Sequence, residues 1–145
     1  MLRTAAACAG LLVVFLLPAT AVAAADPMVK KINDMRRAHG VPALRHSRNL
    51  AHSSKSYARH LMRANRLAHS STGAGAWRRS ARGEILALQR GWRIRRAAAV
   101  RAWLRSPSHR TVLLSRSFRF AGAGVSRGRF GSARSSIWVV RFGRR

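Results

Sequence analysis

A chain of 145 residues has room for one domain with a single hydrophobic core, and no second domain is expected. Its 29 lysines and arginines outnumber three acids, which gives a net charge of +26. This charge should attract anionic polymers at low salt, namely nucleic acids, wall phosphates or lipid head groups. The alternative is that the high arginine content has no binding function, because the basic residues are scattered and a codon-biased genome also enriches arginine. The single cysteine excludes an internal disulfide, so the core must hold the domain together unaided.

The first 25 residues are predicted to be a secretion signal. Arg3 is followed by an apolar run over residues 5–17, then by Pro18 and small residues suited to cleavage near Ala23 to Ala25. The run is too short to span a bilayer as a helix, and an uncleaved anchor is the alternative. We therefore expect a secreted protein, extracellular or attached to the cell envelope, with one domain at 26–145. It should be a monomer with no transmembrane segment after cleavage.

Two helices are predicted in the first half of that domain. Met28, Ile32 and Met35 recur at helical spacing, which predicts a first helix from Pro27 to about Ala38. A second helix is predicted from a serine cap at Ser47 to about residue 64. Its side chains expected to face the core are Tyr57, Ala58, Leu61 and Met62.

The middle of the chain is predicted to hold a loop over 70–82 and a short element over 83–88, either helix or strand. A third helix is expected over residues 97–104. A fourth is expected from Ser106, as N-cap, to about Leu114, with proline in the first helical position. Three tryptophans are expected in the core: Trp92, Trp103 and Trp138.

Two strands are predicted near the C-terminus. Residues 118–125 alternate small and apolar residues, and a turn is expected over 126–135. Residues 137–142 are β-branched or aromatic on both faces, as in a central strand. Helices first and an antiparallel pair last predict an α+β fold.

Three segments resemble the signature of the CAP superfamily, the cysteine-rich secretory, antigen 5 and pathogenesis-related-1 proteins. They are Leu67 to Ser70, Gly83 to Ile85 and Trp103 to Arg110. The compact bacterial branch, called SCP-like, is most similar, and the resemblance covers nearly all of residues 28–143. It implies an α-β-α sandwich in which helices flank a small antiparallel sheet.

The resemblance also implies a site. His69 and His109 would face each other across a cleft, and in some members of the family this pair binds a divalent metal, often zinc. Neutral imidazoles are good zinc ligands. Glu84 matches the family's glutamate and is the candidate catalytic residue, although Ile85 replaces the asparagine that follows it in the family. Ser106 stands where larger members carry a second glutamate.

Glu84 can serve in three ways. It can orient a histidine through a hydrogen bond, activate a bound water as a general base, or pair with one of the many arginines. The remaining residues expected to line the cleft are Ser70, Trp77, Ser106 and Ser108. The other histidines, expected at the surface, are His39, His46, His52 and His60.

Three functions fit these residues. The favoured one is a binding module at the cell envelope or outside the cell, whose ligand is a lipid or a wall component and whose cleft holds an optional metal. The second is a metal-assisted hydrolase that uses the same cleft. A binding module is expected in preference to such an enzyme. The third is a cationic protein that binds anionic polymers through its surface. No specific nucleic-acid binding is expected, and no cofactor other than a metal.

Overall fold

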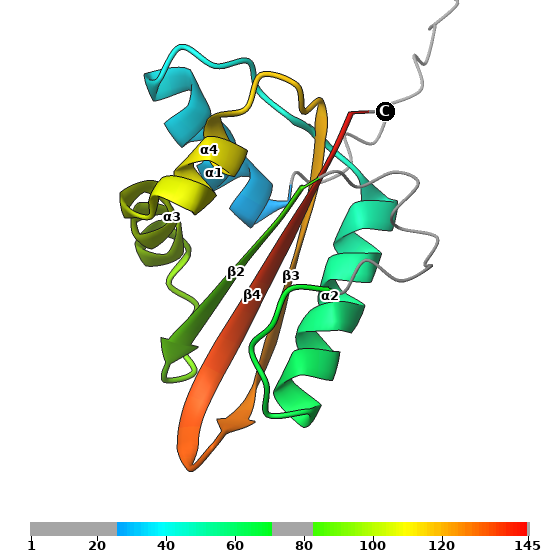
Figure 1. Ribbon diagram of the computed structural model, residues 1–145, viewed down its shortest axis with the longest axis vertical. Coiled ribbons are helices and arrows are strands. Elements are labelled where there is room, and N and C mark those ends of the chain that lie inside the picture. The colour runs from blue at the N-terminus through cyan, green and yellow to red at the C-terminus, as the bar shows by residue number, and fades with distance from the viewer. Residues whose placement is uncertain (1–25, 71–82, 145) are drawn as a thin grey trace, which may run out of the picture.

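In the computed structural model, which describes residues 26–70 and 83–144, a four-stranded sheet lies between two layers of helix (Figure 1). The elements in chain order are α1 (Pro27–Ala38), β1 (Arg45–His46), α2 (Arg48–Arg63), β2 (Gly83–Arg90), α3 (Arg96–Arg105), α4 (Pro107–Leu114), β3 (Phe120–Phe130) and β4 (Ala133–Gly143). The strand order is β1-β3-β4-β2. β1 runs parallel to β3, and the other pairs are antiparallel. The predicted α+β sandwich is confirmed, except that the short parallel strand β1 makes the sheet mixed where an antiparallel one was predicted.

The central strand β4 separates two hydrophobic cores because successive side chains point to opposite faces. Ile137 and Val139 pack with α2 residues on one face. Trp138, Val140 and Phe142 belong to the larger core, which α1, α3 and α4 cover on the other face (Figure 1). Both faces of the strand are buried, as its continuous apolar pattern predicts.

The first two helices begin and end close to where the sequence predicts. The Asp26 side chain caps α1 by accepting a hydrogen bond of 2.8 Å from the backbone N–H of Met28. The Ser47 side chain caps α2 through the N–H of Leu50, at 3.4 Å. Of the four α2 residues expected in the core, Tyr57 is half-buried and the other three are buried.

Several predictions for the second half need correction. The turn between the last strands lies at residues 131–132, not over 126–135, and the ladder continues to the pair Phe130 and Ala133. Residues 126–135 are polar because many of their side chains are exposed to solvent where the sheet extends past the helices. Their backbone nevertheless continues the β3–β4 ladder on both sides of the turn. Residues 83–90 form a strand, and Trp92 is 49% exposed, so its predicted place in the core is wrong.

Arg36 is fully buried, a feature that sequence patterns did not reveal. Its Nε donates to the carbonyl of Pro42 at 2.9 Å, and its Nη1 donates to the carbonyls of Leu113 and Ser115. Burial, and next the charge of Arg116, lowers the pKa of Arg36. The guanidinium thus binds α1 to the end of α4, which holds α4 in place.

Helix α2 lies directly on the backbone of β3. A Cβ atom on Gly122 would lie 2.1 Å from the backbone nitrogen of Ala51, and one on Gly124 would lie 2.1 Å from that of Lys55. The buried hydroxyl of Ser54 donates to the carbonyl of Gly122 at 2.9 Å. The close approach needs glycine at both positions, and it fixes the helix whose C-terminal end leads toward His69.

The described residues contain no helix that is long and apolar enough to cross a membrane. The predicted secretion signal, the domain start that it implies and the predicted loop with Trp77 lie wholly or mostly outside the described residues. They stay predictions.

Replacing Gly124 by alanine should destabilise the protein by roughly 2–3 kcal/mol, because the new Cβ meets backbone atoms of α2 that cannot move alone. Gly128→Ala is the matched control on the same strand, since its Cβ would meet the flexible side chain of Met62 at 2.9 Å. Urea unfolding measures both. Equal free energies of unfolding for the two variants would contradict the close packing of α2 on β3.

Candidate functional site

The side chain of Glu84 is the centre of the site. Glu84 lies on β2, opposite Arg141 of β4, and its side chain is 8% exposed. Its Oε2 accepts from Arg141 Nε at 3.0 Å and from the Ser70 hydroxyl at 2.9 Å. Its Oε1 accepts from the Ser70 backbone N–H at 2.9 Å and lies 3.1 Å from His69 Nδ1. One carboxylate therefore binds β4 and the segment after α2 to β2.

Arg141 is the buried partner of this carboxylate, a role that was not predicted from the sequence. Its side chain is 2% exposed, and its guanidinium carbon lies 5.0 Å from the centroid of the Tyr57 ring. A buried cation needs hydrogen-bonding, charged or aromatic neighbours, and Arg141 has the Glu84 carboxylate and the Tyr57 ring among its neighbours. The signal was present in the sequence as a single arginine within the apolar run 137–142.

Tyr57 connects α2 to the same cluster. Its hydroxyl donates to the carbonyl of Ala68 at 2.9 Å, which holds the chain just before His69. Burial, and next the charge of Glu84, raises the pKa of Tyr57 against the opposing effect of Arg141 and Arg66. The hydroxyl therefore keeps its proton and remains a donor at neutral pH.

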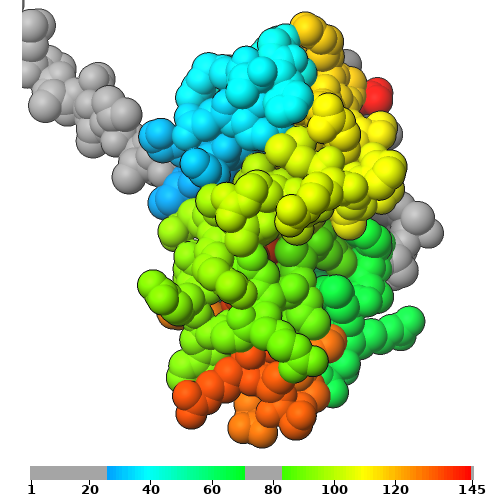
Figure 2. Space-filling model, turned by 90° about the vertical axis from the view of Figure 1, so that its left-hand side faces the viewer, coloured from blue at the N-terminus to red at the C-terminus, as the bar shows by residue number. Residues whose placement is uncertain are grey.

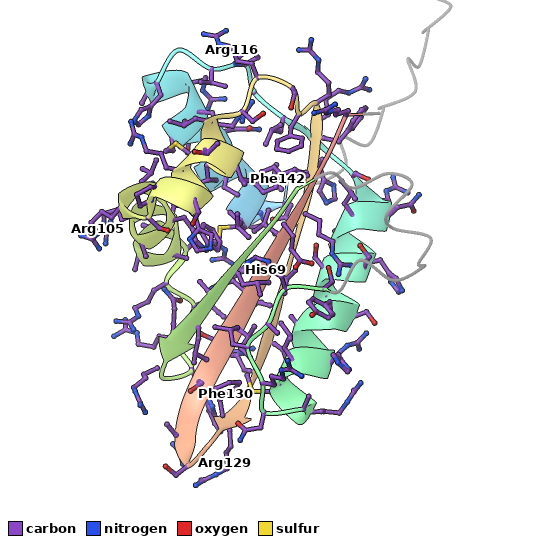
Figure 3. The ribbon with its side chains drawn as sticks, viewed as in Figure 1. His69, Arg105, Arg116, Arg129, Phe130 and Phe142 are labelled. Carbon is purple, nitrogen blue, oxygen red and sulfur yellow. The ribbon has the colours of Figure 1, made fainter. Side chains whose placement is uncertain are left out.

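The two histidines lie side by side, although they are far apart in sequence. The ring centroids of His69 and His109 are 6.5 Å apart, with 38° between the planes. Figure 3 shows His69 beside the strands. Its side chain is 59% exposed, whereas His109, in the first turn of α4, is half-buried. Burial, and next the neighbouring His69, lowers the pKa of His109 below its ordinary value of 6.5. His109 is therefore neutral at neutral pH.

The hydroxyl of Ser106 contacts His109 instead of capping α4. Ser106 occupies the predicted N-cap position, but its side chain makes no capping hydrogen bond. Its Oγ lies 2.8 Å from His109 Nδ1. The exposed Ser108 follows at 3.3 Å from Ser106 Oγ. Ser106 thus acts on His109 much as Glu84 acts on His69, by engaging Nδ1 and setting the ring's direction.

The ring nitrogens determine what the pair can bind. A carboxylate only accepts hydrogen bonds, so His69 Nδ1 carries a proton toward Glu84, and the lone pair of the neutral ring lies on Nε2. In His109, Nδ1 contacts the Ser106 hydroxyl, which can donate or accept, so Nε2 is the ring nitrogen that Ser106 does not engage. The arrangement offers two imidazole nitrogens to one small electrophile, cation or hydrogen-bonding group.

A metal would therefore find two imidazoles and no protein carboxylate. Both oxygens of Glu84 are already engaged. Across 26–70 and 83–144, no three side chains of His, Cys, Asp or Glu are grouped to hold a metal ion. With zinc–nitrogen bonds of about 2.0–2.1 Å and tetrahedral angles, one shared ion would hold the ring centroids roughly 5 Å apart, so the two rings would have to approach each other from their present 6.5 Å. The residues fit an open site that water or a ligand completes, not a closed structural site.

Comparison with known families agrees with this architecture. The model of the cysteine-rich secretory protein family, CAP, matches residues 29–142. The chain belongs to the CAP family. No curated protein sequence is detectably similar to it. The three segments that carry the predicted resemblance, with His69, Glu84 and His109, all lie inside the matched range.

Solved bacterial structures share the fold. An outer surface protein of Borrelia burgdorferi is 26% identical, with a TM-score of 0.62 over 81% of this chain and 90% of the other. An extracellular SCP-domain protein of Bacillus anthracis is 21% identical, with a TM-score of 0.64 over 81% of this chain and 39% of the other. A cysteine-rich secretory protein of Staphylococcus aureus is 16% identical, with a TM-score of 0.54 over 80% of this chain and 37% of the other. The last two show the fold alone.

Replacing Glu84 by glutamine should lower the free energy of unfolding by roughly 3 kcal/mol, because it leaves the buried charge of Arg141 without this carboxylate. Asp34→Asn is the matched control. It removes the same charge from exposed pairs with Lys30 and Arg37, and its effect should stay below about 1 kcal/mol. Urea unfolding at neutral pH measures both. Similar small losses in the two variants would show that Glu84 does not hold the cluster together.

His109 should titrate below pH 6.5 in the metal-free protein, measured by NMR of its ring protons in the presence of a chelator. In His69→Ala the pKa should rise partway but remain below 6.5, since burial is the larger cause. Because the folded pKa is depressed, the unfolded chain binds more protons between the two pKa values, and stability falls as pH drops through that window. A folded-state pKa at or above 6.5 would contradict the burial of His109.

Proposed function

We propose that this CAP-family chain is a binding module at the cell envelope or outside the cell, and that its ligand site is the pair His69 and His109. The observation that carries the proposal is the saturation of Glu84. Its two oxygens take hydrogen bonds from His69, Ser70 and Arg141. A general base needs a free lone pair directed at the reacting water. Glu84 instead positions His69, which is a binding role.

The described location of a solved relative also supports a role at the cell envelope or outside the cell. The solved structure that is 26% identical to this chain is described as an outer surface protein of Borrelia burgdorferi. The predicted secretion signal would send this chain to the same side of the membrane. The partners that we propose for the site are a lipid or a wall component.

A divalent ion such as zinc fits the histidine pair. His69 and His109 would hold it through Nε2, while Glu84 and Ser106 fix the two rings through Nδ1. When bound, the ion would supply a positive centre for a carbonyl or anionic group of the ligand. His109, neutral at neutral pH, is ready to coordinate without first losing a proton.

Zinc titration by calorimetry tests the site. The protein should bind one zinc ion, and His69→Ala/His109→Ala should abolish this binding. Glu84→Gln should weaken it by about 10–100-fold, because His69 loses the group that orients it. The matched control is His39→Ala/His52→Ala, which removes two exposed histidines outside the site. Equal zinc affinity in both double variants would contradict a metal site at the pair.

A further inference from the structure

A second surface lies at the far end of the sheet, away from the histidine pair. We name it the Trp92 surface and define it by Trp92, Arg95, Arg96, Arg129 and Arg134. Figure 2 shows the two parts of the chain that form it, residues around 90–105 and the β3–β4 hairpin, side by side on one face. Figure 3 shows Arg129 at the hairpin tip. Two hydrogen bonds join the parts: Gly91 N–H to the Arg134 carbonyl at 2.7 Å, and Trp92 Nε1 to the Gly128 carbonyl at 3.4 Å.

Neutral groups hold the arginines of this surface. The guanidinium of Arg134 lies 4.7 Å from the Trp92 ring centroid, and that of Arg96 lies 6.0 Å from the Trp138 centroid. Arg129 donates to the Ser132 carbonyl at 2.8 Å, and Arg95 to the Arg90 carbonyl at 3.2 Å. Rings and carbonyls restrict a side chain without cancelling its charge. The surface therefore presents four positioned positive charges.

The chain has no acid left to neutralise them. Its three acidic side chains are all engaged elsewhere. Asp26 caps α1, Asp34 pairs with Lys30 and Arg37, and Glu84 pairs with Arg141. The positive charges of the Trp92 surface also lie close to one another.

Arg129 and Arg134 are direct cross-strand partners, an arrangement that costs stability when both residues carry the same charge. A guanidinium that is already held in place loses less conformational freedom when an anion binds, so the entropic cost of binding is smaller.

We propose that the Trp92 surface binds a flexible phosphodiester polymer of the cell envelope through its phosphates. Guanidinium matches phosphate geometry with two parallel hydrogen bonds, and several guanidiniums in fixed positions suit a repeating anion. This inference goes beyond the proposed function, since it uses none of the residues of the histidine pair.

Other partners fit the surface less well. A membrane would require apolar side chains that are grouped and free to insert, but the exposed large apolar residues among those described are Leu67, Leu88 and Trp92, and the hairpin holds Trp92. Nucleic-acid bases would need an open aromatic face, and Arg134 covers a face of the Trp92 ring. A protein partner would need an apolar core to its interface, which one tryptophan does not supply.

The test measures the binding of fluorescent poly(glycerol phosphate) by anisotropy over a series of salt concentrations. Arg95→Gln/Arg129→Gln/Arg134→Gln should weaken binding at least about tenfold and reduce the slope of log affinity against log salt by about 2–3. The matched control is Arg48→Gln/Arg59→Gln/Arg63→Gln on α2. It removes the same charge from three exposed arginines. Within the described part of the chain, no contact is seen that restricts these three side chains. The control should lose less than about threefold.

Equal losses in the two triple variants would overturn the proposal, because binding would then follow net charge alone. Unfolding curves of both variants establish that each is folded. Poly(dT) with the same number of phosphates should bind no more tightly than poly(glycerol phosphate). Tighter poly(dT) binding that is lost in Trp92→Ala would assign the surface to nucleic acid and overturn the proposal, as would tighter binding to anionic phosphatidylglycerol vesicles. His69→Ala/His109→Ala should keep full polymer binding, which separates this surface from the proposed metal site.

Discussion

The structure depends on one buried ion pair, between Glu84 and Arg141. The pair lies where β2 and β4 meet, and both side chains are almost completely removed from solvent. Either charge alone at this place would be expensive, so each requires the other. Once Glu84 is fixed by Arg141, its remaining lone pairs bind Ser70 and His69. The same interaction thus stabilises the sheet and determines where one histidine of the site lies.

The packing of α2 on β3 gives this pair its geometry. Glycines in β3 let the helix backbone approach the strand directly, which brings Tyr57 over Arg141 and directs the chain through Ala68 to His69. On the opposite side of the sheet, Arg36 binds α1 to the end of α4, the helix that carries His109. Two buried arginines therefore position the two histidines from opposite faces of the sheet.

The parts of the fold that follow local rules were predictable from sequence. The caps and apolar periodicity of α1 and α2 give their bounds almost to the residue, and the apolar run of β4 gives the central strand. The lengths of β3 and β4 were not predictable, since arginine and serine near the hairpin indicate a turn while the ladder pairs them. The motif resemblance singled out His69, Glu84 and His109, and the structure places these side chains close together. Arg36 and Arg141 were missed because their carbonyl and carboxylate partners include groups distant in sequence.

The distribution of charge divides the arginines into two groups. Arg36 and Arg141 are buried and hold the fold together through carbonyls, a carboxylate and an aromatic ring. The exposed arginines have almost no carboxylates to pair with, because the chain has three acids and all are engaged in structure. A strongly positive exterior around a single well-satisfied buried carboxylate is suited to binding anionic partners.

The tautomer of His69 tests the central claim most directly, and nitrogen-15 NMR of the imidazole ring in the metal-free protein measures it. If the Glu84 carboxylate orients this ring, neutral His69 carries its proton on Nδ1 and leaves the Nε2 lone pair for a ligand. The spectrum of the neutral ring should then show a protonated Nδ1 and an unprotonated Nε2, and Glu84→Gln should mix the two tautomers. A proton on Nε2 of His69 in the unmodified protein would contradict the account.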